Sequence, residues 1–203
     1  ICKQVGMTKV AILHAPDTLG TTLTPVVTEH LKEMGIEVVS VQQFAQNEKN
    51  FSSYITKAAA SGCAGFFAPA QVAEMALIMG AVKDAGLNVP CVGSSGAAQQ
   101  MTIDAAPNGS AEGWYACTFW SSSSTEEPMA SWVKEYKERF GRAPESTSAL
   151  TYDSLLLACW AIEEGGSDDP ATVNEQLQKM KDVPGIMSTY TFEQGNRMLS
   201  TKE

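Results

Sequence analysis

Three short segments combine small residues with hydroxyl or amide side chains, and each follows an apolar stretch. They are residues 15–21 (APDTLGT), 68–71 (APAQ) and 93–96 (GSSG). Small residues let a ligand approach the backbone closely, and the first N–H groups of a following helix are free to bind polar groups. This pattern predicts non-covalent binding of a small molecule. The candidate ligand-binding residues are Thr18, Leu19, Ala70, Gln71, Ser94 and Ser95.

Each segment taken alone has a simpler interpretation. Asp, Ser and Thr are the residues that helix N-caps prefer, so each segment is also typical of an ordinary strand-to-helix turn. In an open parallel sheet, however, ligands bind outside the carboxyl ends of the strands. Three such segments at one edge of a sheet therefore favour a binding site.

Residues for covalent or metal chemistry are poorly placed in the sequence. His14 and His30 are the only histidines, and neither has a partner at metal-ligand spacing. The GSSG segment is one residue short of a Gly-x-Ser-x-Gly nucleophile elbow. A triad of His14, Asp17 and Ser94 would depend entirely on the tertiary geometry. We expect neither an enzyme nor a metal site, and no cofactor.

A second class of function uses the first segment differently. Thr18 to Thr22 (TLGTT) is somewhat similar to the loop with which flavodoxins hold the FMN phosphate. Backbone amides and hydroxyl groups at a helix start suit a dianion. Asp17 directly before this loop would repel one. A flavodoxin-like, FMN-binding redox domain therefore stands as the alternative to a binding protein.

Composition excludes several other classes. The chain has 203 residues, of which 44% are hydrophobic, and a net charge of −9. This content is enough for a sizeable core and excludes a disordered chain. The excess of acidic residues argues against nucleic-acid binding, since it repels a phosphate backbone. The longest apolar stretches, residues 75–82 and 155–162, are too short to cross a bilayer.

The five cysteines include no C-x-x-C pair. This pattern is more typical of small buried side chains than of a disulfide framework. Cys63 and Cys91 lie near the starts of two strands that we expect to be neighbours. The sequence leaves open whether these two form a disulfide.

Strand and helix patterns alternate through the first part of the chain. This alternation predicts an α/β fold, a doubly wound parallel sheet with helices on both faces. The expected strands are residues 9–14, 36–44, 64–68, 90–93 and 114–120, and the expected helices are 20–34, 51–60, 72–85 and 97–103.

The pattern changes after a serine-rich tract at residues 121–125. We expect helices at 126–140, 148–162 and 173–180, then a strand at 188–192 and a turn at Gln194-Gly195. The helix at 148–162 is apolar almost all round, which predicts that it is buried. The predicted domains are residues 1–120, an α/β ligand-binding lobe, and residues 121–203, a helical segment and strand of another lobe.

The order of several short features resembles a known family. Asp17-x-x-Gly20 follows the first strand, and Val89-Pro90 precedes a strand that ends at Gly93. Further features are Phe140-Gly141-Arg142-Ala143-Pro144, Thr151-Tyr152-Asp153 and Phe192-x-x-Gly195-Asn196. Their order and spacing are similar to the type I periplasmic binding proteins of branched-chain amino-acid ABC transporters, over nearly the whole chain.

The resemblance implies two α/β lobes that close over a small ligand and deliver it to a membrane permease. The location it implies is periplasmic or extracellular. Residues 9–119 would belong to the second lobe, and the chain from Ser121 would return to an incomplete first lobe. Since residues 1–6 have the pattern of a helix end, we expect further residues upstream. A ligand-sensing receptor with the same lobes is an alternative that the sequence leaves open.

The resemblance also implies a departure at the binding positions. The family's amino-acid binders have aromatic residues where this chain has Leu19 and Ala70, and an acid for the ligand ammonium where it has Ser95. A buried ammonium needs an opposite charge or several acceptors. The expected ligand is therefore a polar or amphipathic metabolite in a broad sense: an amino acid, an amide or a small organic or aromatic acid.

Overall fold

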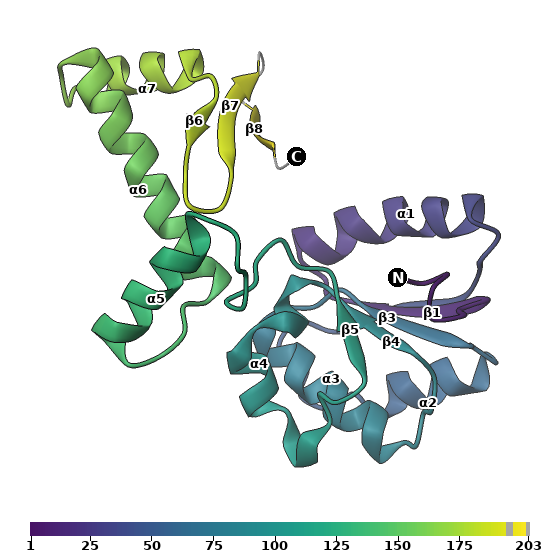
Figure 1. Cartoon of the computed structure of the whole chain (residues 1–203). Coiled ribbons are helices and arrows are strands. Elements are labelled where there is room, and N and C mark those ends of the chain that lie inside the picture. The colour runs from purple at the N-terminus through teal and green to yellow at the C-terminus, as the bar shows by residue number, and fades with distance from the viewer. Residues whose placement is uncertain (194–196, 202–203) are drawn as a thin grey trace. The chain divides into compact units, whose positions relative to one another are not determined.

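The computed structural model describes residues 1–193 and 197–201. The chain folds into two compact units, Ile1–Phe119 (unit 1) and Trp120–Glu203 (unit 2). Figure 1 shows that unit 1 contains a twisted sheet with helices on both faces, whereas unit 2 contains mainly helices and a small sheet. Each unit is described by itself below.

Unit 1 is built on a five-stranded parallel sheet. Its strand order is β2-β1-β3-β4-β5, which requires crossover connections between neighbouring strands. The strands are β1 (Lys9–His14), β2 (Glu37–Gln43), β3 (Gly65–Ala68), β4 (Cys91–Gly93) and β5 (Trp114–Ala116). The predicted doubly wound α/β fold is confirmed.

Helices cover both faces of this sheet. Figure 1 shows α1 on one face and α2 and α3 on the other. The helices are α1 (Thr18–Glu33), α2 (Ser52–Ala60), α3 (Val72–Asp84) and α4 (Gln100–Ala105), with short 3₁₀ turns η1 (Ser95–Ala98) and η2 (Pro107–Gly109). The helix expected at 97–103 is thus divided, because Gln99 has an extended ψ of 137°.

Two apolar clusters fill the space between the sheet and its helices. Phe66 packs in the larger cluster with Met75 and Ile78 of α3. Its neighbour Phe67 packs in the other cluster with Ile12 and with Leu31 of α1. Successive side chains of a strand point to opposite faces, so one strand supplies both cores. A strand buried in this way reads as a continuous apolar run, as the sequence of β3 does.

The last strand of the sheet is shorter than expected. The sequence predicts a strand over residues 114–120, but β5 ends at Ala116. Its neighbour β4 has three residues, and these pair with Trp114, Tyr115 and Ala116 in turn. The prediction was wrong at this end because strand length depends on the partner's length as well as on residue type.

The described residues of unit 2 form three helices and a three-stranded antiparallel sheet. The helices are α5 (Met129–Phe140), α6 (Ser146–Gly165) and α7 (Pro170–Lys179), and the strands are β6 (Val183–Pro184), β7 (Thr189–Glu193) and β8 (Arg197–Thr201). The sequence predicts β7 but neither β6 nor β8. The turn expected at Gln194-Gly195 lies outside the described residues.

A buried carboxylate joins α6 to the chain that forms this sheet. Asp153 accepts hydrogen bonds from the backbone N–H groups of Ile186 (2.8 Å) and Met187 (3.0 Å) and from the Tyr190 hydroxyl (2.7 Å). Burial, and then the contact with Asp153, raise the pKa of Tyr190. Asp153 therefore fixes the turn between β6 and β7 against the helix.

Helix α6 is not buried all round, which corrects the expectation for residues 148–162. Ala149, Leu157 and Ala161 face the core of unit 2, but Leu155 is 65% exposed and Tyr152 is 43% exposed. The Tyr152 ring still packs against Trp132 of α5, but the side chain of Leu155 is largely uncovered among the described residues. Apolar composition alone does not reveal whether a packing partner is present.

Candidate ligand-binding rim

The parallel sheet of unit 1 brings the three predicted segments to one edge. Strands β1, β3 and β4 are adjacent and parallel, and the register pairs Ile12 with Phe67 and Ala68 with Gly93. Each strand therefore ends at the same edge, and each is followed by one of the segments. We call residues 15–21, 68–71 and 93–96 together the rim.

Hydrogen bonds join the three segments of the rim to one another. The Gln71 side-chain amide donates to Asp17 Oδ2 at 2.9 Å, and the Ala15 N–H donates to the Pro69 carbonyl at 3.2 Å. The Ser94 hydroxyl donates to the Ala70 carbonyl at 3.1 Å. The middle segment is thus bonded to both of its neighbours, and the rim is one connected structure.

Two glycines allow this close packing. A Cβ on Gly20 would lie 2.1 Å from the Ala15 carbonyl oxygen, and one on Gly96 would lie 3.0 Å from that of Ala70. Any larger residue at Gly20 would collide with the backbone at the end of β1. The glycines are therefore needed here for space, not for a special backbone conformation.

The six predicted residues have different positions in the rim. Thr18, Leu19 and Gln71 are exposed, and Ser95 is half-buried. Ala70 and Ser94 are buried, and the Ser94 hydroxyl is already used as a donor to Ala70. The structure thus leaves four of the six with side chains at the surface, while Ala70 and Ser94 hold the segments together.

Asp17 gives the rim a fixed negative charge. Its Oδ1 accepts a hydrogen bond from the Gly20 N–H at 2.9 Å, as the N-cap of α1. The Gly20 amide, followed by the Gln71 side chain, lowers the pKa of the Asp17 carboxyl. This carboxylate occupies the helix N-terminus where an FMN phosphate would need to bind, so the flavodoxin interpretation is not favoured.

Sequence reasoning identified the segments but missed the bond between Asp17 and Gln71. These residues are 54 positions apart, and no local pattern links them. The Asp17-x-x-Gly20 spacing is a signal for the N-cap only, since Asp is a common first-turn acceptor. The cross-segment contact depends on the order of strands in the sheet.

The groups considered for catalysis have other partners. The buried His14 has its Nδ1 2.8 Å from the Ala15 carbonyl oxygen, and the Ser94 hydroxyl donates to Ala70. Asp17 receives its bonds from Gly20 and Gln71. Across the part of the chain that the structure describes, no group of three metal-ligating side chains is found and no helix is long and apolar enough to cross a membrane.

The fold is a parallel α/β sheet with helices on both faces, and the rim lies at the carboxyl edge of that sheet. The chain belongs to the periplasmic binding protein family, whose model matches residues 1–202. The family assignment expected from the order of short features is thereby confirmed.

Individual relatives are distant in sequence but close in fold. An amino acid binding protein of Pseudomonas aeruginosa is 23% identical over 170 residues, which are 84% of this chain and 45% of that protein. A leucine binding protein of Thermotoga maritima has 21% identity and a TM-score of 0.88, covering 98% of this chain and 57% of its own.

A third relative has a different ligand. The solute binding protein of an ABC transporter from R. palustris, in complex with 4-hydroxybenzoate, has 19% identity and a TM-score of 0.83. The match covers 98% of this chain and 56% of the R. palustris chain. The chain thus spans about half the length of the relatives that it matches. At these identities the solved structures show the fold alone.

Proposed function

We propose that the protein binds a small metabolite without altering it and delivers the ligand to the permease of an ABC importer. Within this function, the rim of unit 1 forms one wall of the ligand site. The observation that carries the proposal is the hydrogen-bonded connection of all three segments through Gln71, Ala70 and Ser94. A preformed wall binds a ligand at a lower entropic cost than three independent loops would.

The two units have different roles in this proposal. Unit 1 is the α/β ligand-binding lobe, and unit 2 is a helical segment and strand of the other lobe of the binding protein. The family to which the chain belongs supports this division. The same membership supports a periplasmic or extracellular location, where such proteins meet their ligands.

The ligand class follows from the exposed groups of the rim. Thr18 and Ser95 offer hydroxyl groups, Gln71 offers an amide, and Leu19 offers an apolar edge. This set fits an amino acid, an amide or a small organic or aromatic acid. The ligands named for the relatives, leucine and 4-hydroxybenzoate, both combine a carboxylate with an apolar part.

Ligand-induced thermal stabilisation tests the proposal. The protein is heated with L-leucine, L-isoleucine, 4-hydroxybenzoate or a wider set of organic acids and amides, each at millimolar concentration. A ligand that binds only the folded state raises the melting temperature in a concentration-dependent way. No shift with any compound of the set would contradict the proposal.

A pair of variants places the binding at the rim. Ser95→Tyr adds a large ring to the third segment of the rim and is expected to abolish the shift. Ser53→Tyr places the same ring on the exposed surface of α2 and is expected to retain it. If the two variants respond alike to the bound compound, the rim is not the site.

A further inference from the structure

A second concave site lies at the opposite edge of the unit 1 sheet from the rim. It is a pocket of about 470 Å³ beside the first residues of β4 and β5 and the end of α3. Its walls come from the end of α3, the loop of residues 86–89 and the turn of residues 109–114. Pockets that hold small ligands have about 300–1,000 Å³.

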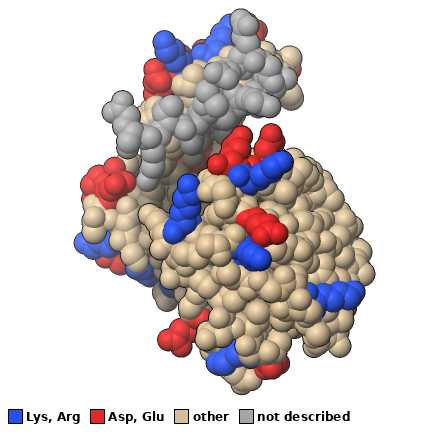
Figure 2. Space-filling view, turned by 90° about the vertical axis from the view of Figure 1, so that its right-hand side faces the viewer, with Lys and Arg blue, Asp and Glu red and all other residues tan. Residues whose placement is uncertain are grey.

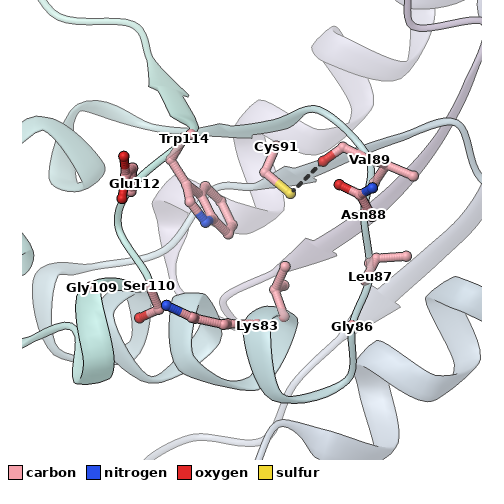
Figure 3. A pocket seen from close by; sticks show the side chains of 12 residues that line it. Lys83, Gly86, Leu87, Asn88, Val89, Cys91, Gly109, Ser110, Glu112 and Trp114 are labelled. Carbon is pink, nitrogen blue, oxygen red and sulfur yellow. Dashed lines mark hydrogen bonds between the residues drawn. The ribbon is translucent and has the colours of Figure 1, made fainter.

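The lining of this pocket combines apolar and polar groups. Leu87, Val89, the Cys91 thiol and the Trp114 ring provide the apolar surface. Figure 3 shows the Trp114 indole on one side of the pocket and the Lys83 side chain on the other. The exposed amide of Asn88 lies at the margin. A few polar groups around an apolar wall are typical of ligand sites.

Three glycines keep the walls of the pocket open. Gly86, Gly109 and Gly113 all have positive φ values, between 62° and 81°, and apart from the adjoining residues no atom lies within 4 Å of where a Cβ would be. The backbone of two of the walls is therefore directly accessible to a bound molecule. The pocket has room at the positions where side chains would otherwise narrow it.

A buried hydroxyl in the pocket wall lacks a partner. Ser110 is 4% exposed, and its Oγ forms no hydrogen bond among the described residues. A buried polar group without a partner is costly, so an acceptor within reach of this hydroxyl is favoured. The Lys83 ammonium is close by, because it donates to the carbonyl of Asn108, two residues before Ser110.

We propose that this pocket binds a small carboxylic acid with an aromatic or branched apolar part. The apolar part lies against Trp114 and Leu87, and the carboxylate accepts from the Lys83 ammonium and, after rotation about one bond, from the Ser110 hydroxyl. Glu112 is the acidic residue of the lining, and Figure 3 shows its carboxylate away from Lys83. This site is separate from the rim and does not depend on the function proposed there.

Benzoate serves as the probe, with neutral benzamide as its matched analogue. Amide and indole N–H signals are followed by NMR during titration of the protein to 20 mM of each compound. We expect saturable shifts of the Trp114 indole and of the Gly109 and Gly113 amides with benzoate, and at least fivefold weaker binding of benzamide. A Trp114→Phe variant assigns the indole signal.

Charge variants separate this site from the rest of the surface. Lys83→Met is expected to weaken benzoate binding at least fivefold, and Lys83→Gln is expected to do the same if the methionine variant is unfolded. Lys57→Met, an exposed lysine of α2, is the control and is expected to bind as the unaltered protein does. Equal affinity in the Lys83 and Lys57 variants would overturn the proposal.

The remaining results of the titration also test the proposed acid-binding pocket. No saturable shift at 20 mM, or equal affinities for benzoate and benzamide, would overturn the proposed site. Shifts confined to Thr18, Gln71 and Ser95 would overturn it while supporting the rim. If a longer polypeptide from the same gene no longer binds benzoate here, the pocket is filled by protein and the small-acid proposal fails.

Discussion

At the scale of single residues, the carboxylate of Asp153 is a buried acceptor of several hydrogen bonds. It is 2% exposed and accepts three hydrogen bonds from Ile186, Met187 and Tyr190. A buried charge remains stable only when its acceptor sites are used in this way. One side chain of α6 therefore holds the turn between β6 and β7, which also has an internal hydrogen bond from the Gly185 N–H to the Ser188 carbonyl.

Replacing this carboxylate should destabilise the protein. In Asp153→Asn, an amide N–H₂ faces backbone donors, and we expect the free energy of unfolding to fall by about 3 kcal/mol. Urea unfolding measures the change. Asp168→Asn alters an exposed residue and should stay within about 0.5 kcal/mol. Similar losses in the two variants would show that Asp153 has no special role.

Asp17 should make the stability of the protein depend on pH in the acid range. Because the Gly20 amide and the Gln71 side chain lower the pKa of the folded Asp17 carboxyl from its ordinary value, folding favours the ionised form. The resulting stability is fully present above the unfolded pKa and is lost as the pH falls through the folded value. We expect Asp17→Asn to reduce the loss of stability between about pH 5 and pH 2. Unfolding at several pH values measures it, and an unchanged pH profile would refute the expectation.

At the scale of elements, the contact of α1 with the end of β1 decides the shape of the rim. Helix α1 starts at Thr18 and passes so close to Ala15 that only glycine fits at position 20. Its N-cap, Asp17, is the residue that receives the bond from Gln71. The start of one helix therefore positions one segment and connects it to the next.

A methyl group at Gly20 should disturb this contact. Gly20→Ala places a Cβ 2.1 Å from the Ala15 carbonyl oxygen, so α1 must move away from β1. We expect a loss of about 3 kcal/mol in the free energy of unfolding, and a weaker ligand response at the rim. Thr22→Ala, on the exposed side of the same helix, should have little effect. Thermal unfolding compares them, and equal stability would contradict the predicted clash.

At the scale of the whole molecule, the five cysteines differ in how far their thiols are exposed. All five are free thiols in the structure, so the disulfide left open for Cys63 and Cys91 is not formed. Burial, with a smaller contribution from nearby Cys63, raises the pKa of the Cys91 thiol to about 12. Cys117 and Cys159 are exposed, and Cys159 lies on α6 near Leu155.

The rate of thiol alkylation should follow the exposure of the cysteines. Only a thiolate reacts, so we expect Cys117 and Cys159 to be modified at least about tenfold faster than Cys91 at pH 8. Peptide mass spectrometry after iodoacetamide measures the three rates. Under the proposed lobe division, a longer polypeptide should protect Cys159, because the rest of its lobe would cover that face of α6. Equal reactivity of Cys159 in both would count against the division.

Local patterns in the sequence are sufficient for most of the elements. The apolar runs of β1 and β3, the helix start at Asp17 and the glycines that follow α1, α2 and α3 are encoded over a few residues. The same patterns predict the three segments and their position at strand ends. A parallel α/β fold follows, because alternating strands and helices of these lengths pack in very few ways.

Contacts between distant residues were decided only in the tertiary structure. The bond from Gln71 to Asp17, the partnership of Asp153 with Tyr190 and the early end of β5 each depend on which strand or helix lies alongside. The exposed face of α6 has the same origin, since an apolar helix is buried only where another element covers it. Sequence patterns have a range of a few residues, whereas these contacts join residues up to 54 positions apart.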